Sequence, residues 1–124
     1  MIASILHPGE MGISVAAAAV QSGHSVLWVS DGRSDKTKKR AESLKLKDVE
    51  KLSELAESDV IFSICPPQVA IETATSVSAT DFKGLYVDAN AGSPETKKLI
   101  SEILNKNNID FVDAGIVGPP PNFE

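Results

Sequence analysis

The sequence has little cysteine, no excess of positive charge and no unbroken apolar segment long enough for a membrane span. A single cysteine, Cys65, excludes an intramolecular disulfide and fits a reducing compartment, so we expect a cytoplasmic protein. The formal net charge of −5 at pH 7 argues against general binding to nucleic acids or to membrane surfaces. The longest stretch without charged side chains, residues 11–30, is interrupted by Gln21, Gly23 and His24, which indicates a buried helix followed by a strand. Acidic, cysteine and histidine residues with metal-ligand spacing are also lacking, so no metal site is expected.

What is present is an α/β pattern that begins at the first residues. A short aliphatic run, residues 2–6, stops at Pro8-Gly9 and passes into an alanine-rich segment of helical length. Strand, tight turn and helix are the start of a dinucleotide-binding βαβ unit. The glycines of the Rossmann fingerprint would fall at positions 7, 9 and 12, and two of the three are present as Gly9 and Gly12.

The residue at the first glycine position is His7, which precedes a proline. That proline favours extended geometry, which a residue other than glycine tolerates, so the turn can still form. The first amides of the following helix favour an anion, and we expect the cofactor's phosphates there. Two roles for the His7 imidazole stay open: it donates to a phosphate, or it merely ends the strand. The predicted cofactor-binding residues of this turn are His7, Pro8, Gly9, Glu10, Met11 and Gly12.

The rest of the chain alternates apolar runs with helical segments. Strands are expected at residues 25–29, 46–49, 59–65, 85–88 and 109–112, with helices between them. Asp48 is predicted to cap the helix that follows it, and Ser93 to cap a helix that begins with Pro94. We therefore predict a Rossmann-type doubly wound parallel sheet in one domain, residues 1–118, with residues 119–124 as an exit segment.

Ligands of this fold bind beyond the carboxyl ends of the strands, so the loop after the second strand is the next candidate site. Asp31 lies about 20 residues after the glycine turn, the usual distance for an acid that binds the ribose hydroxyls of NAD. Arg33 and Ser34 offer a cation and a hydroxyl, which suit the 2′-phosphate of NADP. We predict NADP, with NAD as the alternative, and assign Ser30, Asp31, Arg33 and Ser34 to the cofactor. The basic residues 38–40 are interpreted as a solvated helix face.

Five motifs in order resemble the N-terminal domain of one enzyme family. They are Gly9-Glu10-Met11-Gly12, Gly32-Arg33-Ser34, Asp59-Val60-Ile61 leading to Pro66-Pro67, Val87-Asp88 leading to Ser93-Pro94-Glu95-Thr96, and Phe111-Val112-Asp113-Ala114. The family is that of 6-phosphogluconate dehydrogenase and 3-hydroxyisobutyrate dehydrogenase, the β-hydroxyacid dehydrogenases. The resemblance implies an oxidoreductase that exchanges hydride between NADP and a small hydroxy- or oxo-compound.

The resemblance also implies further site residues. The loop of Cys65, Pro66 and Pro67 would flank the nicotinamide, and Asn90 would contact both cofactor and substrate. Gly92 and Gly118 would complete the substrate site. The chain departs from the family's pattern here, because Asn90 replaces a serine and Pro119 removes a backbone donor. The resemblance to the family therefore supports a hydroxyacid substrate less strongly than it supports the cofactor.

The family's catalytic lysine lies in a helix of a C-terminal helical domain, through which a homodimer is also implied. That lysine would lie beyond Glu124, and none of the chain's own lysines directly follows a predicted strand, so no catalytic residue is assigned. We expect nucleotide binding without turnover, with the ionised Asp88 and Asp113 repelling a substrate carboxylate. Two other classes stay open: a non-catalytic nucleotide-sensing or scaffold domain, and, more distantly, a methyltransferase.

Overall fold

The structure, a computed structural model, describes residues 2–6, 10–30, 35–64, 69–90 and 93–114. Six strands form one parallel sheet in the order β3-β2-β1-β4-β5-β6. The strand order therefore reverses between β1 and β4, which confirms the predicted Rossmann-type doubly wound fold. The strands are β1 (Ile2–Leu6), β2 (Ser25–Trp28), β3 (Lys47–Asp48), β4 (Val60–Ser63), β5 (Leu85–Asp88) and β6 (Asp110–Asp113). The helices are α1 (Glu10–Gln21), α2 (Asp35–Ser43), the 3₁₀ helix η1 (Leu52–Glu57), α3 (Ala70–Ser78) and α4 (Pro94–Asn105).

Side chains of neighbouring strand residues enter two different cores, one on each face of the sheet. On β1, Ile5 packs in a cluster with α1 and α2 residues such as Ala16 and Ala41. The next residue, Leu6, packs in the other cluster, to which α3 and α4 contribute. Consecutive strand residues point to opposite faces, so a strand that is apolar at both positions is buried on both sides. This is why continuous apolar runs predicted the central strands.

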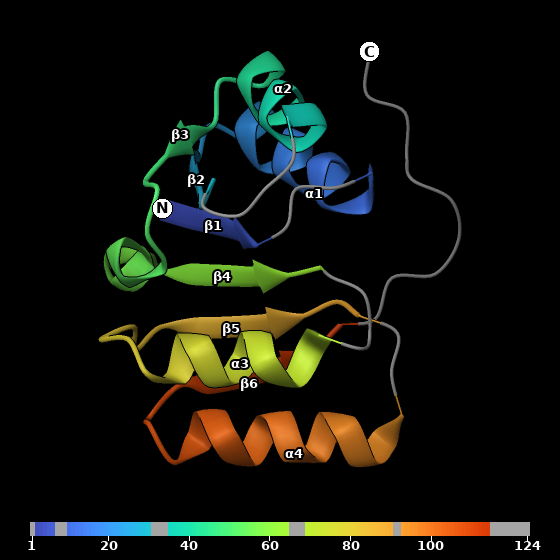
Figure 1. Cartoon of the computed structure of the whole chain (residues 1–124), viewed down its shortest axis with the longest axis vertical. Helices are drawn as coiled ribbons and strands as arrows, with labels where there is room; N and C mark the ends of the chain where they lie inside the picture. The colour runs from blue at the N-terminus through green and yellow to red at the C-terminus, as the bar shows by residue number, and fades with distance from the viewer. Residues whose placement is uncertain (1, 7–9, 31–34, 65–68, 91–92, 115–124) are drawn as a thin grey trace.

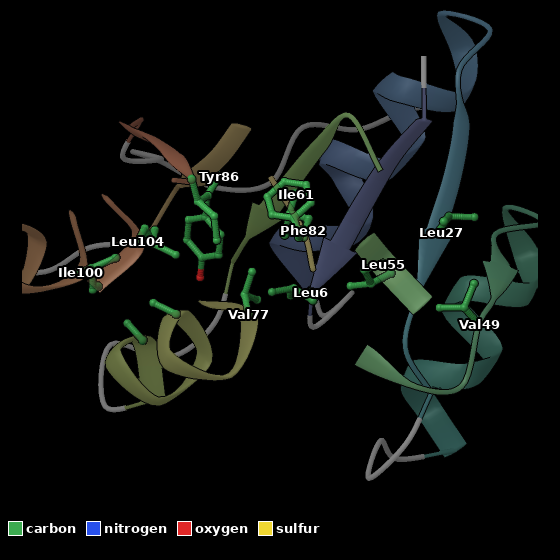
Figure 2. Packing of buried hydrophobic residues seen from close by; sticks show 13 residues of the cluster. Leu6, Leu27, Val49, Leu55, Ile61, Val77, Phe82, Tyr86, Ile100 and Leu104 are labelled. Atoms are coloured by element: carbon green, nitrogen blue, oxygen red, sulfur yellow. The ribbon is translucent and has the colours of Figure 1, made fainter. Parts of the chain in front are cut away.

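The larger cluster extends across the width of the sheet. Figure 2 shows its labelled side chains as one continuous row, from Ile100 on α4 past Tyr86 on β5 to Val49 beyond β3. Within the part of the chain that the structure describes, no helix is long and apolar enough to cross a membrane.

One predicted helix start is confirmed and another is wrong. Ser93 caps α4, because its Oγ accepts a hydrogen bond from the Thr96 amide at 3.2 Å, and Pro94 follows it in the first turn. Asp48 does not cap η1, whose N-cap is Lys51. The backbone turns at Glu50, which has a φ of 64°, and this separates Asp48 from the helix. The Asp48 carboxylate instead accepts the Glu50 amide at 2.8 Å.

Candidate functional site

The carboxyl ends of the strands meet along one edge of the sheet. In Figure 1 the arrowheads of β1, β4 and β5 point to the same side. The register places Leu6 beside Ser63, Ser63 beside Asp88, and Asp88 beside Asp113. Ligands of doubly wound sheets bind beyond this edge, nearest to the reversal of strand order between β1 and β4. The strands β4, β5 and β6 end at this edge in polar residues that the structure describes, and these residues are Ser63, Asp88 and Asp113.

A lysine from α4 connects the ends of β5 and β6. The Lys97 Nζ lies 3.0 Å from Asp88 Oδ1 and 3.0 Å from Asp113 Oδ1. It also donates to the main-chain oxygen of Asn90 at 2.6 Å. The side chain of Lys97 is 12% exposed and that of Asp88 is 1% exposed, whereas Asp113 is half exposed. The three protons of the ammonium thus have three acceptors, which is the full hydrogen-bonding capacity of a lysine.

The sequence places no lysine directly after a predicted strand, and Lys97 instead reaches this edge from a helix. Helix α4 begins at the edge where β5 ends, so a side chain from its first turns can reach back to the strand ends. The signal in the sequence is the position of Lys97 one turn after the N-cap Ser93. The charge expected at Asp88 and Asp113 also changes. Two carboxylates share one ammonium, so this group of side chains carries a net charge of −1 and not −2.

The environment of Lys97 stabilises its charged form. Burial by itself lowers the pKa of the Lys97 ammonium, but the hydrogen bonds and charges of Asp88 and Asp113 outweigh it, so the net pKa is raised above 10.5. A group with a raised pKa is a weak proton donor at neutral pH, and its three protons are already engaged. Lys97 is thus suited to hold its neighbours in place and unsuited to act as a general acid.

Asn90, predicted to bind cofactor and substrate, is held from three elements. Its main-chain amide donates to Asp88 Oδ1 at 2.8 Å, and its main-chain oxygen accepts from Lys97. Its Nδ2 donates to the Ser63 Oγ at 3.3 Å, at the end of β4. Asn90 is 5% exposed. We call Ser63, Asp88, Asn90, Lys97 and Asp113 the Asn90 network, since every member contacts Asn90 directly or through one neighbour.

On the other half of the sheet, Ser30 follows β2 at the same edge. Its amide donates to Asp48 Oδ1 at 3.2 Å. Burial raises the pKa of Asp48, but the hydrogen bonds from Ser30 and Glu50 and the charge of Lys38 lower it by more. The net pKa is therefore below 3.8. The sequence predicts Asp48 only as a helix cap and gives it no place in the site, because the contact with Ser30 depends on the pairing of β2 and β3. It fixes the main chain where the predicted Asp31–Ser34 loop begins.

Most of the other predicted site residues lie outside the described residues. These are His7, Pro8, Gly9, Asp31, Arg33, Ser34, Cys65, Pro66, Pro67, Gly92 and Gly118. Glu10, Met11 and Gly12 form the first turn of α1, so the N-terminus of that helix lies just beyond the carboxyl end of β1. Their roles in cofactor binding stay predictions. Among the described residues, no group of three or more His, Cys, Asp or Glu side chains is placed to hold a metal ion.

The stability of the domain should depend on pH through Lys97. Because the pKa of this lysine is raised on folding, its stabilising contribution is complete below 10.5 and is lost as the pH rises through the folded-state value. We expect the difference in unfolding free energy between the wild type and Lys97→Met to shrink as the pH is raised from neutral to above 10.5. Urea denaturation of both proteins across that range measures it. A constant difference would contradict an ion-paired Lys97.

Comparison with known proteins identifies relatives of this chain. Residues 3–92 match the family model described as "NADP oxidoreductase coenzyme F420-dependent". An uncharacterised 28.5 kDa protein from Methanothermus fervidus is 38% identical over 88 residues, which are 70% of this chain and 34% of that protein. The chain therefore spans about a third of the length of that relative.

Two solved structures share the fold at low sequence identity. One is 3-hydroxyisobutyrate dehydrogenase from Mycobacterium tuberculosis, solved with L-serine, with a TM-score of 0.84 and 21% identity over 95% of this chain and 41% of that one. The other is an imine reductase from Myxococcus stipitatus in complex with NADP+, with a TM-score of 0.80 and 19% identity over 97% of this chain and 42% of that one. Both neighbours are more than twice as long as this chain.

Proposed function

Because the chain belongs to the family of coenzyme F420-dependent NADP oxidoreductases, we propose that it binds NADP along the carboxyl edge of its sheet for hydride exchange. NAD is the alternative cofactor, and a small hydroxy- or oxo-compound is the proposed hydride partner. The observation that carries the proposal is the placement of α1, which begins at Glu10 directly beyond β1, beside the reversal of strand order.

The described residues fit a dinucleotide in three respects. The first amides of α1, which have no acceptor within the helix, suit a pyrophosphate at the reversal of strand order. The edge beyond β2 and β3, with Ser30 and Asp48, suits the adenosine half, and the edge beyond β4 to β6 suits the nicotinamide half. The bound cofactor would supply the hydride, and the chain's own residues would orient it.

We further propose that the proton donor belongs to a helical domain like the one implied by the resemblance to β-hydroxyacid dehydrogenases. The greater length of the structural neighbours supports this. So does the state of Lys97, whose raised pKa and three acceptors make it a poor acid. Our proposals of a homodimer and of an oxoacid or hydroxyacid substrate are based on the same resemblance.

Calorimetric titration of the 124-residue chain with NADPH, NADP+ and NADH tests the proposal. We expect binding of the phosphorylated cofactors in preference to NADH. No heat at millimolar nucleotide would overturn it. Nucleotide binding without turnover of hydroxyacids, oxoacids or coenzyme F420 by the longer protein would favour a nucleotide-sensing domain over an enzyme.

A further inference from the structure

We propose that Lys97 is a positioning residue for the nicotinamide half of the cofactor, acting through Asn90. The inference rests on the proposed function and adds a residue to it. Nothing in the five sequence motifs assigns Lys97 a role, because only its place in the fold brings it to the strand ends.

The first observation is how the peptide backbone of Asn90 is held. Its N–H donates to Asp88 Oδ1 at 2.8 Å, and its C=O accepts from Lys97 Nζ at 2.6 Å. The Lys97 ammonium and the same Asp88 oxygen are 3.0 Å apart, so a closed ring of three hydrogen bonds fixes this residue. The side chain adds the bond from Nδ2 to Ser63. Asn90 is thereby held against β4, β5 and α4 at once.

The second observation is that this arrangement is buried. Asp88, Ser63 and Asn90 are each at most 5% exposed. Charges taken out of water cost desolvation energy, and well-packed apolar residues often stabilise a fold as well or better. An ion pair whose carboxylate is fully buried and whose lysine holds one loop residue is therefore better explained by the geometry that it imposes on that residue. Asp88 Oδ2 is buried with no hydrogen-bond partner among the described residues, so the pair is not optimised for stability alone.

The third observation is the position of the Asn90 network in the fold. All five members of the Asn90 network belong to the β4-α3-β5-α4-β6 half, and Ser63, Asp88 and Asp113 are in register at its carboxyl edge. Each half of a doubly wound dinucleotide-binding sheet takes one mononucleotide. Disturbing the Asn90 network should therefore affect the nicotinamide half and spare the adenosine half.

The test compares the whole dinucleotide with its adenosine half. Calorimetry measures the affinity of the 124-residue chain and of its Lys97→Met variant for NADPH and for adenosine 2′,5′-bisphosphate. We expect the variant to bind NADPH on the order of tenfold more weakly, a difference of about 1.4 kcal/mol. Its affinity for adenosine 2′,5′-bisphosphate should stay within twofold of the wild type. Methionine retains most of the length of lysine and removes the charge.

Two further variants make the result decisive. Lys98→Met is the matched control, because Lys98 is the next residue on α4 and its side chain is exposed. It should change neither affinity. Ser63→Ala cuts the hydrogen bond to Asn90 from the opposite side, and we expect the same selective loss in a milder form. If Lys97→Met does not fold, Ser63→Ala decides the question.

The outcomes separate this inference from the proposed function. A wild-type chain that binds neither ligand refutes the proposed function itself. If the wild type binds both, equal losses for both ligands would show that Lys97 acts only on stability, and no loss for either would show that the position of Asn90 is irrelevant. Either result overturns the inference and leaves NADP binding intact.

Discussion

Lys97→Met is expected to lower the free energy of unfolding by about 3 kcal/mol at neutral pH. The variant leaves Asp88, which is 1% exposed, without its ammonium partner, and removing one member of a buried pair costs about 3–5 kcal/mol. The lower end applies because Asp113, the second carboxylate, is half exposed and can be hydrated. A domain of this size is usually stable by about 5–15 kcal/mol, so the variant should still fold.

Urea denaturation of the wild type, Lys97→Met and Lys98→Met measures this effect. The control should stay within about 0.5 kcal/mol of the wild type, as surface substitutions usually do. A loss below about 1 kcal/mol for Lys97→Met would show that the pair behaves like an exposed ion pair. The Asn90 network would then be too weakly coupled to hold the strand ends in place.

Arg33→Ala is expected to weaken NADP binding far more than NAD binding. A charge-assisted hydrogen bond from the guanidinium to the 2′-phosphate contributes about 1.5–3 kcal/mol, which corresponds to roughly a 10- to 150-fold change in affinity. NAD lacks that phosphate, so its affinity should stay nearly constant. Arg33 lies outside the described residues, so this prediction rests on its position two residues after Asp31 in the loop beyond β2.

Titrations of the wild type and of Arg33→Ala with NADP+ and with NAD+ give the ratio of the two affinities in each protein. Lys39→Ala on α2 is a suitable control, since this residue is exposed on a basic helix face. Equal loss for both cofactors after Arg33→Ala would mean that the arginine does not contact the 2′-phosphate. In that case Asp31 would be the residue that determines cofactor choice, and NAD would become the favoured cofactor.

Much of this fold could be predicted because its signals are local. The apolar run that contains Val60–Ser63 is buried on both faces, and such a run has few alternatives to a central parallel strand. Ser93 followed by Pro94 predicts a helix start from hydrogen-bonding capacity and from a fixed φ, and neither depends on distant residues. The prediction that Asp48 caps the next helix failed because the hydrogen-bond partner of its carboxylate is not fixed by the local sequence. A carboxylate can accept from several amides, and the turn at Glu50 selected which.

By itself, therefore, the sequence determined the order of strands and helices and the doubly wound sheet, and it predicts the loops where a nucleotide would bind. Only the tertiary structure decided which residues meet at those loops. Asp88, Lys97 and Asp113 are spread over 26 residues and come from two strands and a helix. Their contact depends on β5 and β6 being paired in register and on α4 starting at the edge where β5 ends. Periodicity and capping are properties of neighbouring residues, whereas the partner of a charged side chain is set by the packing of elements that the chain brings together only on folding.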